Sequence, residues 1–235
     1  MYLLFLFLLN INFVNSINVS VLGAGYSGMV SALELNKLGY NVSIYEKNDF
    51  VGGRSYELLL NNNSYFNSGP SWYWMPQTYE NIFNNYLTNN ISFYELDKLN
   101  NSFKLLFNNT YLEIPNNIKE IFELFDSIDK NNKVREFIKI AEANYKFSEK
   151  FMFNKYNFFD LINFNNIKNL HNYFRNFDKH INKFINNNLI KSLLKWPVIF
   201  IGNNPKTSPS FYSLLTYIGY NNGTYYPKNG MNAPI

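Results

Sequence analysis

A glycine-rich turn near the N-terminus constrains the fold of this chain more than any other feature. The β-branched run at residues 17–22 (INVSVL) leads directly into GAGYSG at residues 23–28, and the residues that follow have the apolar spacing of a helix. In this order Gly23 permits a tight turn, Gly25 lets the backbone approach a pyrophosphate, and Gly28 lets the helix pack closely on the strand. The sequence therefore predicts the start of a dinucleotide-binding βαβ unit, with the phosphates at the helix N-terminus.

The second strand of this unit is predicted at residues 41–45 (NVSIY), after a helix that ends at Gly39. It delivers Glu46 about 20 residues beyond the glycines, where a carboxylate accepts hydrogen bonds from the ribose hydroxyls of adenosine. A carboxylate repels a 2′-phosphate, so the pattern favours FAD or NAD over NADP. Glycine-rich turns also occur for purely structural reasons, but the ordered strand, helix, second strand and acid favour nucleotide binding.

The residues after Glu46 distinguish FAD from NAD. Gly52, Gly53 and Arg54 follow with the spacing Glu-x5-Gly-Gly-Arg. This spacing resembles the extended FAD motif of the amine oxidase, protoporphyrinogen oxidase and phytoene desaturase group, although a simple loop turn is the alternative. A glycine pair lets a second backbone segment close over the pyrophosphate, and the arginine adds forked donors. The residues expected to bind the cofactor are Gly23, Ala24, Gly25, Tyr26, Ser27, Gly28, Glu46, Lys47, Gly52, Gly53 and Arg54.

Two later stretches narrow the resemblance to the bacterial-type phytoene desaturases, a family of FAD-dependent carotenoid desaturases. Residues 65–73 (YFNSGPSWY) look like the F-x-x-G-P-S/T segment of that family. Residues 196–231 are similar to its G-x-x-P, P-x-x-Y-x-L and G-x-W-Y-P-x-G-G-M elements, with departures at Tyr225, where Trp is usual, and Asn229, where Gly is usual. The resemblance implies an α/β fold in which a Rossmann-like FAD-binding domain carries an inserted, largely helical α+β substrate domain.

The resemblance also implies a division of the chain. Residues 1–16 form an apolar extension, residues 17–78 belong to the FAD-binding domain, and residues 79–235 belong to a membrane-associated substrate domain that is incomplete at its C-terminus. Family members continue for about as many residues again, so we expect this chain of 235 residues to be truncated. It is then either one half of a split enzyme, with a separately encoded C-terminal half as its partner, or a non-catalytic remnant.

The activity implied by the resemblance is desaturation of phytoene or a related carotenoid precursor. FAD accepts a hydride from an allylic carbon while the neighbouring carbon loses a proton, and the protein buries the polyene beside the flavin. The candidates for lining the substrate tunnel are Trp72, Tyr73, Trp74 and Tyr212, although large aromatic residues more often belong to an ordinary core. No catalytic base is assigned, and a ketolase, an isomerase or a shorter-chain desaturase fits the same motifs.

Composition excludes several other classes of protein. The chain has no cysteine and only two histidines, which excludes disulfides and cysteine nucleophiles and argues against a zinc site. Lys and Arg number 21 against 17 Asp and Glu, and a net charge of 21 − 17 = +4 with no recognisable nucleic-acid module argues against a nucleic-acid partner.

Two segments bear on membrane contact. Residues 1–9 (MYLLFLFLL) are about as long as the apolar core of a signal peptide, but no Lys or Arg precedes them. We therefore interpret them as the product of an upstream start codon or as a weak membrane-contacting extension, rather than as a signal. Residues 118–195 are expected to be mostly helical, and residues 168–195 alternate basic with aromatic side chains. This stretch is either a face that lies on an anionic membrane or a solvated face over a Phe and Ile core. We expect a cytoplasmic protein peripheral to the cell membrane.

Overall fold

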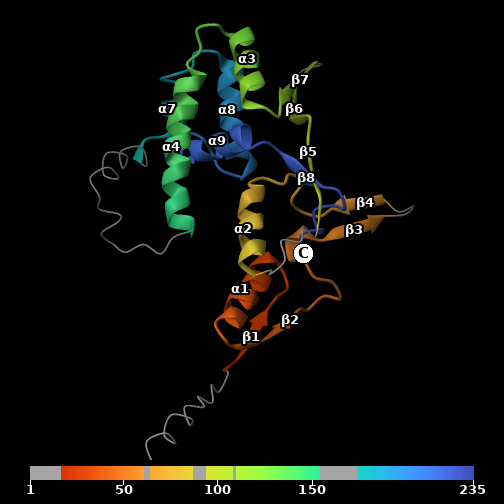
Figure 1. Cartoon of the computed structure of the whole chain (residues 1–235). Helices are drawn as coiled ribbons and strands as arrows, with labels where there is room; N and C mark the ends of the chain where they lie inside the picture. The colour runs from red at the N-terminus through yellow and green to blue at the C-terminus, as the bar shows by residue number, and fades with distance from the viewer. Residues whose placement is uncertain (1–16, 61–63, 87–93, 108–109, 154–173) are drawn as a thin grey trace, which may run out of the picture. The chain divides into compact units, whose positions relative to one another are not determined.

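The computed structural model describes residues 17–60, 64–86, 94–107, 110–153 and 174–235. These residues form two compact units. The first comprises the described residues within Met1–Ser71, Gln77–Glu95 and Pro227–Ile235, and the second comprises those within Trp72–Pro76 and Leu96–Tyr226. The apolar extension at residues 1–16 lies outside the described residues. Figure 1 shows the order of the helices and strands along the chain.

The first unit is built on the βαβ element that the glycine turn predicts. Strand β1 (Asn18–Leu22), helix α1 (Tyr26–Lys37) and strand β2 (Asn41–Tyr45) follow one another, and the strands are parallel and in register from Asn18 with Asn41 to Leu22 with Tyr45. Gly39, just beyond the helix, has φ +90°, a left-handed conformation that favours glycine and lets the chain turn into β2. The expected Rossmann-like start of the chain is therefore confirmed.

The remainder of the first unit covers and extends this element. A short helical turn η1 (Gly53–Ser55) leads into the antiparallel hairpin of β3 (Glu57–Leu60) and β4 (Ser64–Asn67). Helix α2 (Pro76–Tyr86) packs beside α1, where the Tyr79 ring meets the Tyr26 ring edge-on with centroids 5.7 Å apart.

The C-terminal residues return to the first unit. The Lys228 amide donates to the Glu95 carbonyl (2.9 Å), and the Met231 amide donates to Glu57 Oε1 (2.6 Å). The described residues of Gln77–Glu95 and Pro227–Ile235 therefore belong to the first unit. The division at residue 78 that the resemblance implies stays a prediction.

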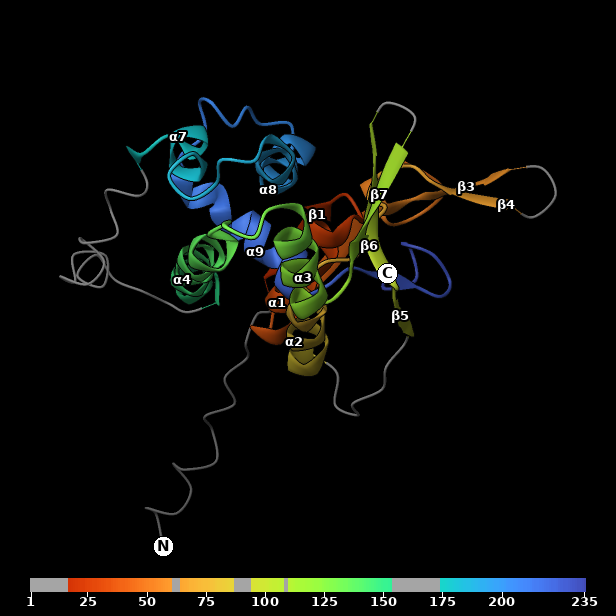
Figure 2. The same ribbon diagram turned by 90° about the horizontal axis from the view of Figure 1, so that it is seen from above.

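The second unit combines short strands with helices. Strand β5 (Leu96–Lys98) pairs with β8 (Tyr225–Pro227), and β6 (Asn101–Phe107) forms an antiparallel hairpin with β7 (Thr110–Pro115). The helical elements are α3 (Ile118–Ile128), α4 (Val134–Phe153), α7 (Phe177–Ile181), α8 (Asn188–Phe200), η2 (Ser210–Tyr212) and α9 (Ser213–Asn221). Helix α9 contacts α3, α4 and α8 (Figure 2). The expected helical character of residues 118–195 holds for the described part, and residues 154–173 lie outside it.

Asparagine side chains begin three of these helices. Asn117, Asn176 and Asn187 each accept a hydrogen bond from a backbone N–H in the first turn, at 2.9 Å from Lys119, Lys179 and Leu189 respectively. An asparagine at this position satisfies an amide that has no partner within the helix and stabilises it by about 1 kcal/mol. An asparagine-rich sequence thus supplies the caps that fix where these helices start.

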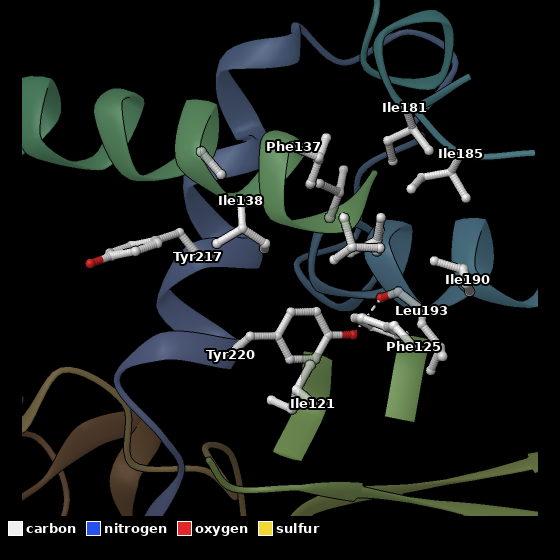
Figure 3. Packing of buried hydrophobic residues seen from close by; sticks show 14 of the residues in the cluster. Ile121, Phe125, Phe137, Ile138, Ile181, Ile185, Ile190, Leu193, Tyr217 and Tyr220 are labelled. Atoms are coloured by element: carbon white, nitrogen blue, oxygen red, sulfur yellow. Dashed lines mark hydrogen bonds between the residues drawn. The ribbon is translucent and has the colours of Figure 1, made fainter. Parts of the chain in front are cut away.

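The core of the second unit lies where α3, α4, α8 and α9 meet. Figure 3 shows side chains from these helices packed together, among them Phe125, Phe137, Leu193 and Tyr220. The Phe125 and Tyr220 rings meet edge-on with centroids 6.1 Å apart, a favourable arrangement of two aromatic quadrupoles. From the basic and aromatic stretch, Phe177 is fully buried in this core, and Lys195 pairs with Asp178.

A proline inside α8 creates a polar group that the core has to satisfy. Pro197 has no N–H, so the carbonyl of Leu193, four residues earlier, loses its partner in the helix. The hydroxyl of Tyr220 donates to that carbonyl at 2.7 Å (Figure 3). Burial raises the pKa of Tyr220, so the hydroxyl keeps its proton and remains a donor.

Replacing Tyr220 with phenylalanine is expected to lower the free energy of unfolding by about 1–3 kcal/mol, because it leaves the buried Leu193 carbonyl without a partner. Urea denaturation of the full chain measures this. In a Pro197→Ala background the restored N–H bonds to the Leu193 carbonyl. Tyr220→Phe should then lower the free energy of unfolding by a smaller amount. An equal cost in both backgrounds would contradict the assignment.

No helix in the described part of the chain is both long enough and apolar enough to cross a membrane. Residues 168–173 of the basic and aromatic stretch lie outside that part.

Candidate functional site

The glycine-turn residues gather at the N-terminus of α1. The Gly23 amide donates to the Tyr45 carbonyl at 2.7 Å, which ties the ends of β1 and β2 together, and Gly23 has φ +101°. Helix α1 begins at Tyr26, and the Met29 amide bonds to the Gly25 carbonyl at 3.0 Å. The amides of the first helical turn have no carbonyl partner within a helix, and together with the helix dipole they favour an anion.

The second glycine pair lies directly against this turn. The Gly52 amide donates to the Ala24 carbonyl at 2.8 Å, and Gly52 forms a parallel bridge with Gly25. Gly52 and Gly53 have φ +107° and +56°, and a Cβ on Gly53 would lie 3.2 Å from the Gly25 Cα. The structure therefore brings together, through contacts between backbone atoms, two turns that α1 and β2 separate along the chain.

Two further glycines are required for packing. A Cβ on Gly28 would overlap the Gly23 carbonyl oxygen and would lie 3.5 Å from Val21 Cγ1, so the absence of a side chain lets α1 lie close to β1. A Cβ on Gly69 would overlap the Arg54 carbonyl oxygen. Gly69 belongs to the G-P element of the sequence, and its position explains why glycine stands there.

A pocket of about 650 Å³ opens at this junction, and we call it the phosphate pocket. Its lining residues are Gly25, Tyr26, Ser27, Gly52, Gly53, Arg54, Ser55, Gly69 and Pro70. They include the start of α1 and one guanidinium group, and none of them carries a carboxylate. A pocket with amide donors, a cation and little side-chain bulk suits a pyrophosphate.

A second pocket in the same unit, of about 560 Å³, has the opposite chemistry, and we call it the acidic pocket. Its lining residues are Glu46, Asn48, Asp49, Phe50, Val51, Tyr56, Glu57, Tyr65 and Asn232. Three carboxylates make it rich in hydrogen-bond acceptors, and the stacked Phe50 and Tyr56 rings, with centroids 3.6 Å apart, give it a flat apolar surface. It suits an uncharged aromatic ligand that donates hydrogen bonds, such as adenosine, and it repels phosphate.

Glu46 joins the glycine turn at the start of α1 to the loop that begins at Glu46 itself. Its Oε2 accepts from the Ala24 amide at 2.7 Å, and its Oε1 accepts from the Asn48 amide at 3.0 Å and from Asn48 Nδ2 at 2.8 Å. The bonds from the Ala24 and Asn48 amides lower the pKa of Glu46, so its carboxylate is ionised at neutral pH. Lys47 is the next residue along the chain and is not among the lining residues of either pocket.

A dinucleotide cofactor fits these residues. The glycines at positions 25, 52 and 53 leave room for a pyrophosphate at the donor-rich pocket, and the acceptor-rich pocket is built on the same loop, residues 46–56. FAD would be held by the α1 amides and Arg54 at its phosphates and by Glu46 at its ribose hydroxyls.

The four aromatic candidates for the substrate tunnel lie in the second unit and fall into two groups. Trp72 and Trp74 are stacked with centroids 6.3 Å apart, and the Trp72 ring also meets Trp196 at 5.3 Å and Phe200 at 4.7 Å. We call Trp72, Trp74, Trp196 and Phe200 the aromatic cluster. Trp196 and Phe200 were not among the sequence candidates, because their distance in sequence from Trp72 conceals the contact.

The two tyrosine candidates lie away from these tryptophans, one buried and the other half-buried. Tyr73 is 1% exposed, and its backbone pairs with that of Tyr225 at 3.0 and 3.1 Å. Tyr212 packs against the hydrophobic core. The structure thus brings the two tryptophans together and places the tyrosines elsewhere.

Comparison with known proteins agrees with this arrangement. Residues 21–88 match the family described as "NAD(P)-binding Rossmann-like domain". A carotenoid 3,4-desaturase from Haloarcula japonica is 24% identical over 230 residues, which cover 93% of this chain and 46% of the relative. A 4,4′-diapophytoene desaturase (4,4′-diaponeurosporene-forming) from Staphylococcus aureus is 27% identical, over 91% of this chain and 44% of the relative. The resemblance to carotenoid desaturases is confirmed. The chain spans less than half the length of these relatives.

Solved structures show the same fold. Putrescine oxidase bound to putrescine has a TM-score of 0.54 at 12% identity, over 92% of this chain and 48% of that protein. RAB GDI from Plasmodium falciparum has a TM-score of 0.53 at 14% identity, over 93% and 54%. These likenesses establish the α/β fold with its Rossmann-like domain. Because one neighbour is an oxidase and the other a GDI, the fold does not by itself identify the chemistry.

Proposed function

We propose that this chain provides the FAD-binding unit and part of the substrate-binding unit of a carotenoid desaturase that acts on phytoene or a related precursor. The observation that carries the proposal is the contact of the Gly52-Gly53 turn with Gly25 at the start of α1. This contact lines a pocket whose chemistry suits a pyrophosphate, on the residues that resemble an FAD motif. The similarity to carotenoid desaturases over more than nine-tenths of the chain supports the substrate class.

The residues of the chain have separate tasks in this proposal. FAD, when bound, supplies the acceptor for the hydride that leaves the polyene. The α1 amides and Arg54 hold its pyrophosphate, and Glu46 orients the adenosine ribose. Trp72 and Trp74, in the aromatic cluster, provide apolar surface for a hydrocarbon and exclude water from it. No residue is assigned as the base that takes the proton.

The proposal also covers which polyene is the substrate and where in the cell the protein acts. The two relatives are named for different desaturations, so phytoene, a shorter polyene or a later intermediate each fits the same class. Ile199, Phe200 and Ile201 are 54%, 45% and 46% exposed at the end of α8, which supports peripheral contact of a cytoplasmic protein with the membrane that dissolves the substrate. A separately encoded C-terminal half is the proposed protein partner.

The purified chain is expected to bind FAD, because the phosphate pocket and Glu46 are both formed within its first unit. The measurement is the visible absorbance of the chain alone and of the chain co-expressed with a C-terminal half, followed by an assay of phytoene desaturation. NAD serves as the control ligand and is expected to bind more weakly. Absence of bound flavin from both preparations would contradict the proposal.

A further inference from the structure

The segment at residues 227–235 brings a polar side chain to the acidic pocket. Asn232 lines this pocket together with Glu46, which lies near the start of the chain. Its Oδ1 atom is buried and has no hydrogen-bond partner within the described parts of the chain. Folded proteins satisfy nearly all buried polar atoms, so an atom of this kind at the wall of a pocket indicates a ligand that supplies the missing bond.

The position of Asn232 is fixed by the two residues that precede it. The Met231 amide donates to Glu57 Oε1 at 2.6 Å. The preceding residue, Gly230, has φ +88°, and a Cβ there would overlap the Glu57 carboxylate. Glu57 therefore holds the segment at a point where only glycine fits, two residues before Asn232.

Asn232 also depends on the glycine turn of the cofactor site. A Cβ on Gly52 would lie 2.7 Å from Asn232 Oδ1 and 3.7 Å from its Cγ. The side chain thus occupies space that Gly52 leaves open, beside the loop that carries Glu46. Rotation about the terminal torsion of an asparagine costs little, so the amide can turn toward a bound ligand.

The charge of the pocket selects the ligand. Glu46, Asp49 and Glu57 all line it, and these carboxylates repel phosphate and favour groups that donate hydrogen bonds. Adenosine offers such donors in its ribose hydroxyls and its adenine amine. We propose that Asn232 is a further cofactor-binding residue, whose side-chain amide accepts a hydrogen bond from the adenosine half of the dinucleotide in the acidic pocket. This inference rests on the proposed function.

The test compares Asn232→Leu with Asn229→Leu in the full chain. Asn229 lies three residues earlier in the same segment and is exposed, so it provides a matched control. Affinity for FAD is measured by flavin fluorescence, and affinity for ADP, which carries adenosine and pyrophosphate without flavin, by calorimetry. Asn232→Leu is expected to weaken both ligands by about fivefold to tenfold, the effect of one hydrogen bond, and Asn229→Leu to leave both unchanged.

Thermal unfolding without ligand separates binding from structure. Leucine removes a buried polar atom that has no partner, so the melting temperature of Asn232→Leu should equal or exceed that of the unsubstituted chain. Unchanged affinity for FAD and ADP would overturn the role of Asn232 and leave the FAD assignment intact, and so would weaker binding that accompanies a lower melting temperature. Failure of the unsubstituted chain to bind either ligand, both alone and when co-expressed with a C-terminal half, would overturn both proposals.

Discussion

Replacing Gly28 with alanine is expected to lower the free energy of unfolding of the first unit by about 3 kcal/mol, the upper end of the usual cost of overpacking. The added Cβ would overlap the Gly23 carbonyl oxygen and would lie 3.1 Å from the Gly23 carbonyl carbon. Both are backbone atoms at the end of β1, so neither can move without separating α1 from the strand. Replacing a glycine within a helix by alanine normally stabilises the protein by about 1 kcal/mol. A loss of stability in Gly28→Ala would therefore indicate that α1 lies close to the Gly23 backbone.

Hydrogen exchange of the β1 and β2 amides measures this effect in the unit concerned. Ser31→Ala is the matched control, because Ser31 is an exposed residue of the same helix. We expect the protection of these amides from exchange to fall in Gly28→Ala and to stay unchanged in Ser31→Ala. Protection in Gly28→Ala equal to that of the unsubstituted chain would show that α1 does not need glycine at this position.

Replacing Gly25 with alanine is expected to remove FAD binding and to leave the fold intact. Gly25 has φ −84° and ψ 177°, a conformation open to any residue, and its added Cβ would meet the Gly53 Cα at an ordinary 3.7 Å. The same methyl group would occupy the phosphate pocket, where the backbone has to approach the pyrophosphate closely. Displacing the pyrophosphate from several amide donors should weaken binding by about 100-fold or more, or about 2.7 kcal/mol.

Fluorescence titration with FAD, together with thermal unfolding of the unliganded chain, measures the two properties separately. Gly25→Ala should retain the melting temperature of the unsubstituted chain, in contrast to Gly28→Ala. Tight binding of FAD by Gly25→Ala would mean that the phosphates do not approach this turn. The two glycines, three residues apart, thus distinguish a requirement of the fold from a requirement of the ligand.

The βαβ element was predictable because its constraints are local. The expected strands at residues 17–22 and 41–45 correspond to Asn18–Leu22 and Asn41–Tyr45. Glycine spacing determines a turn, and apolar periodicity determines which side of a helix is covered, so both are readable within a short window of sequence. The helical character expected over residues 118–195 follows from the same periodicity, whereas helix α9 (Ser213–Asn221) was not anticipated.

The rest of the candidate site depends on contacts between distant segments. Asn232 reaches the acidic pocket because Glu57 binds the Met231 amide, and no periodicity or motif connects those two positions. The aromatic candidates show a related limit. Trp72 and Tyr73 are neighbours in sequence, yet one belongs to the aromatic cluster and the other is 1% exposed with its backbone paired to Tyr225. Residue type alone could not show which of the two belongs to the aromatic cluster and which to the buried interior.

The bond between Glu57 and Met231 also sets an order of events during synthesis. The two residues are 174 positions apart. At about 5–20 residues per second, a ribosome needs roughly 9–35 s to pass from one to the other. During that interval the nascent βαβ element has its glycine turns but lacks the segment that completes the acidic pocket. Completion of the acidic pocket is therefore a late step of synthesis, and the cofactor site that we propose can form in full only then.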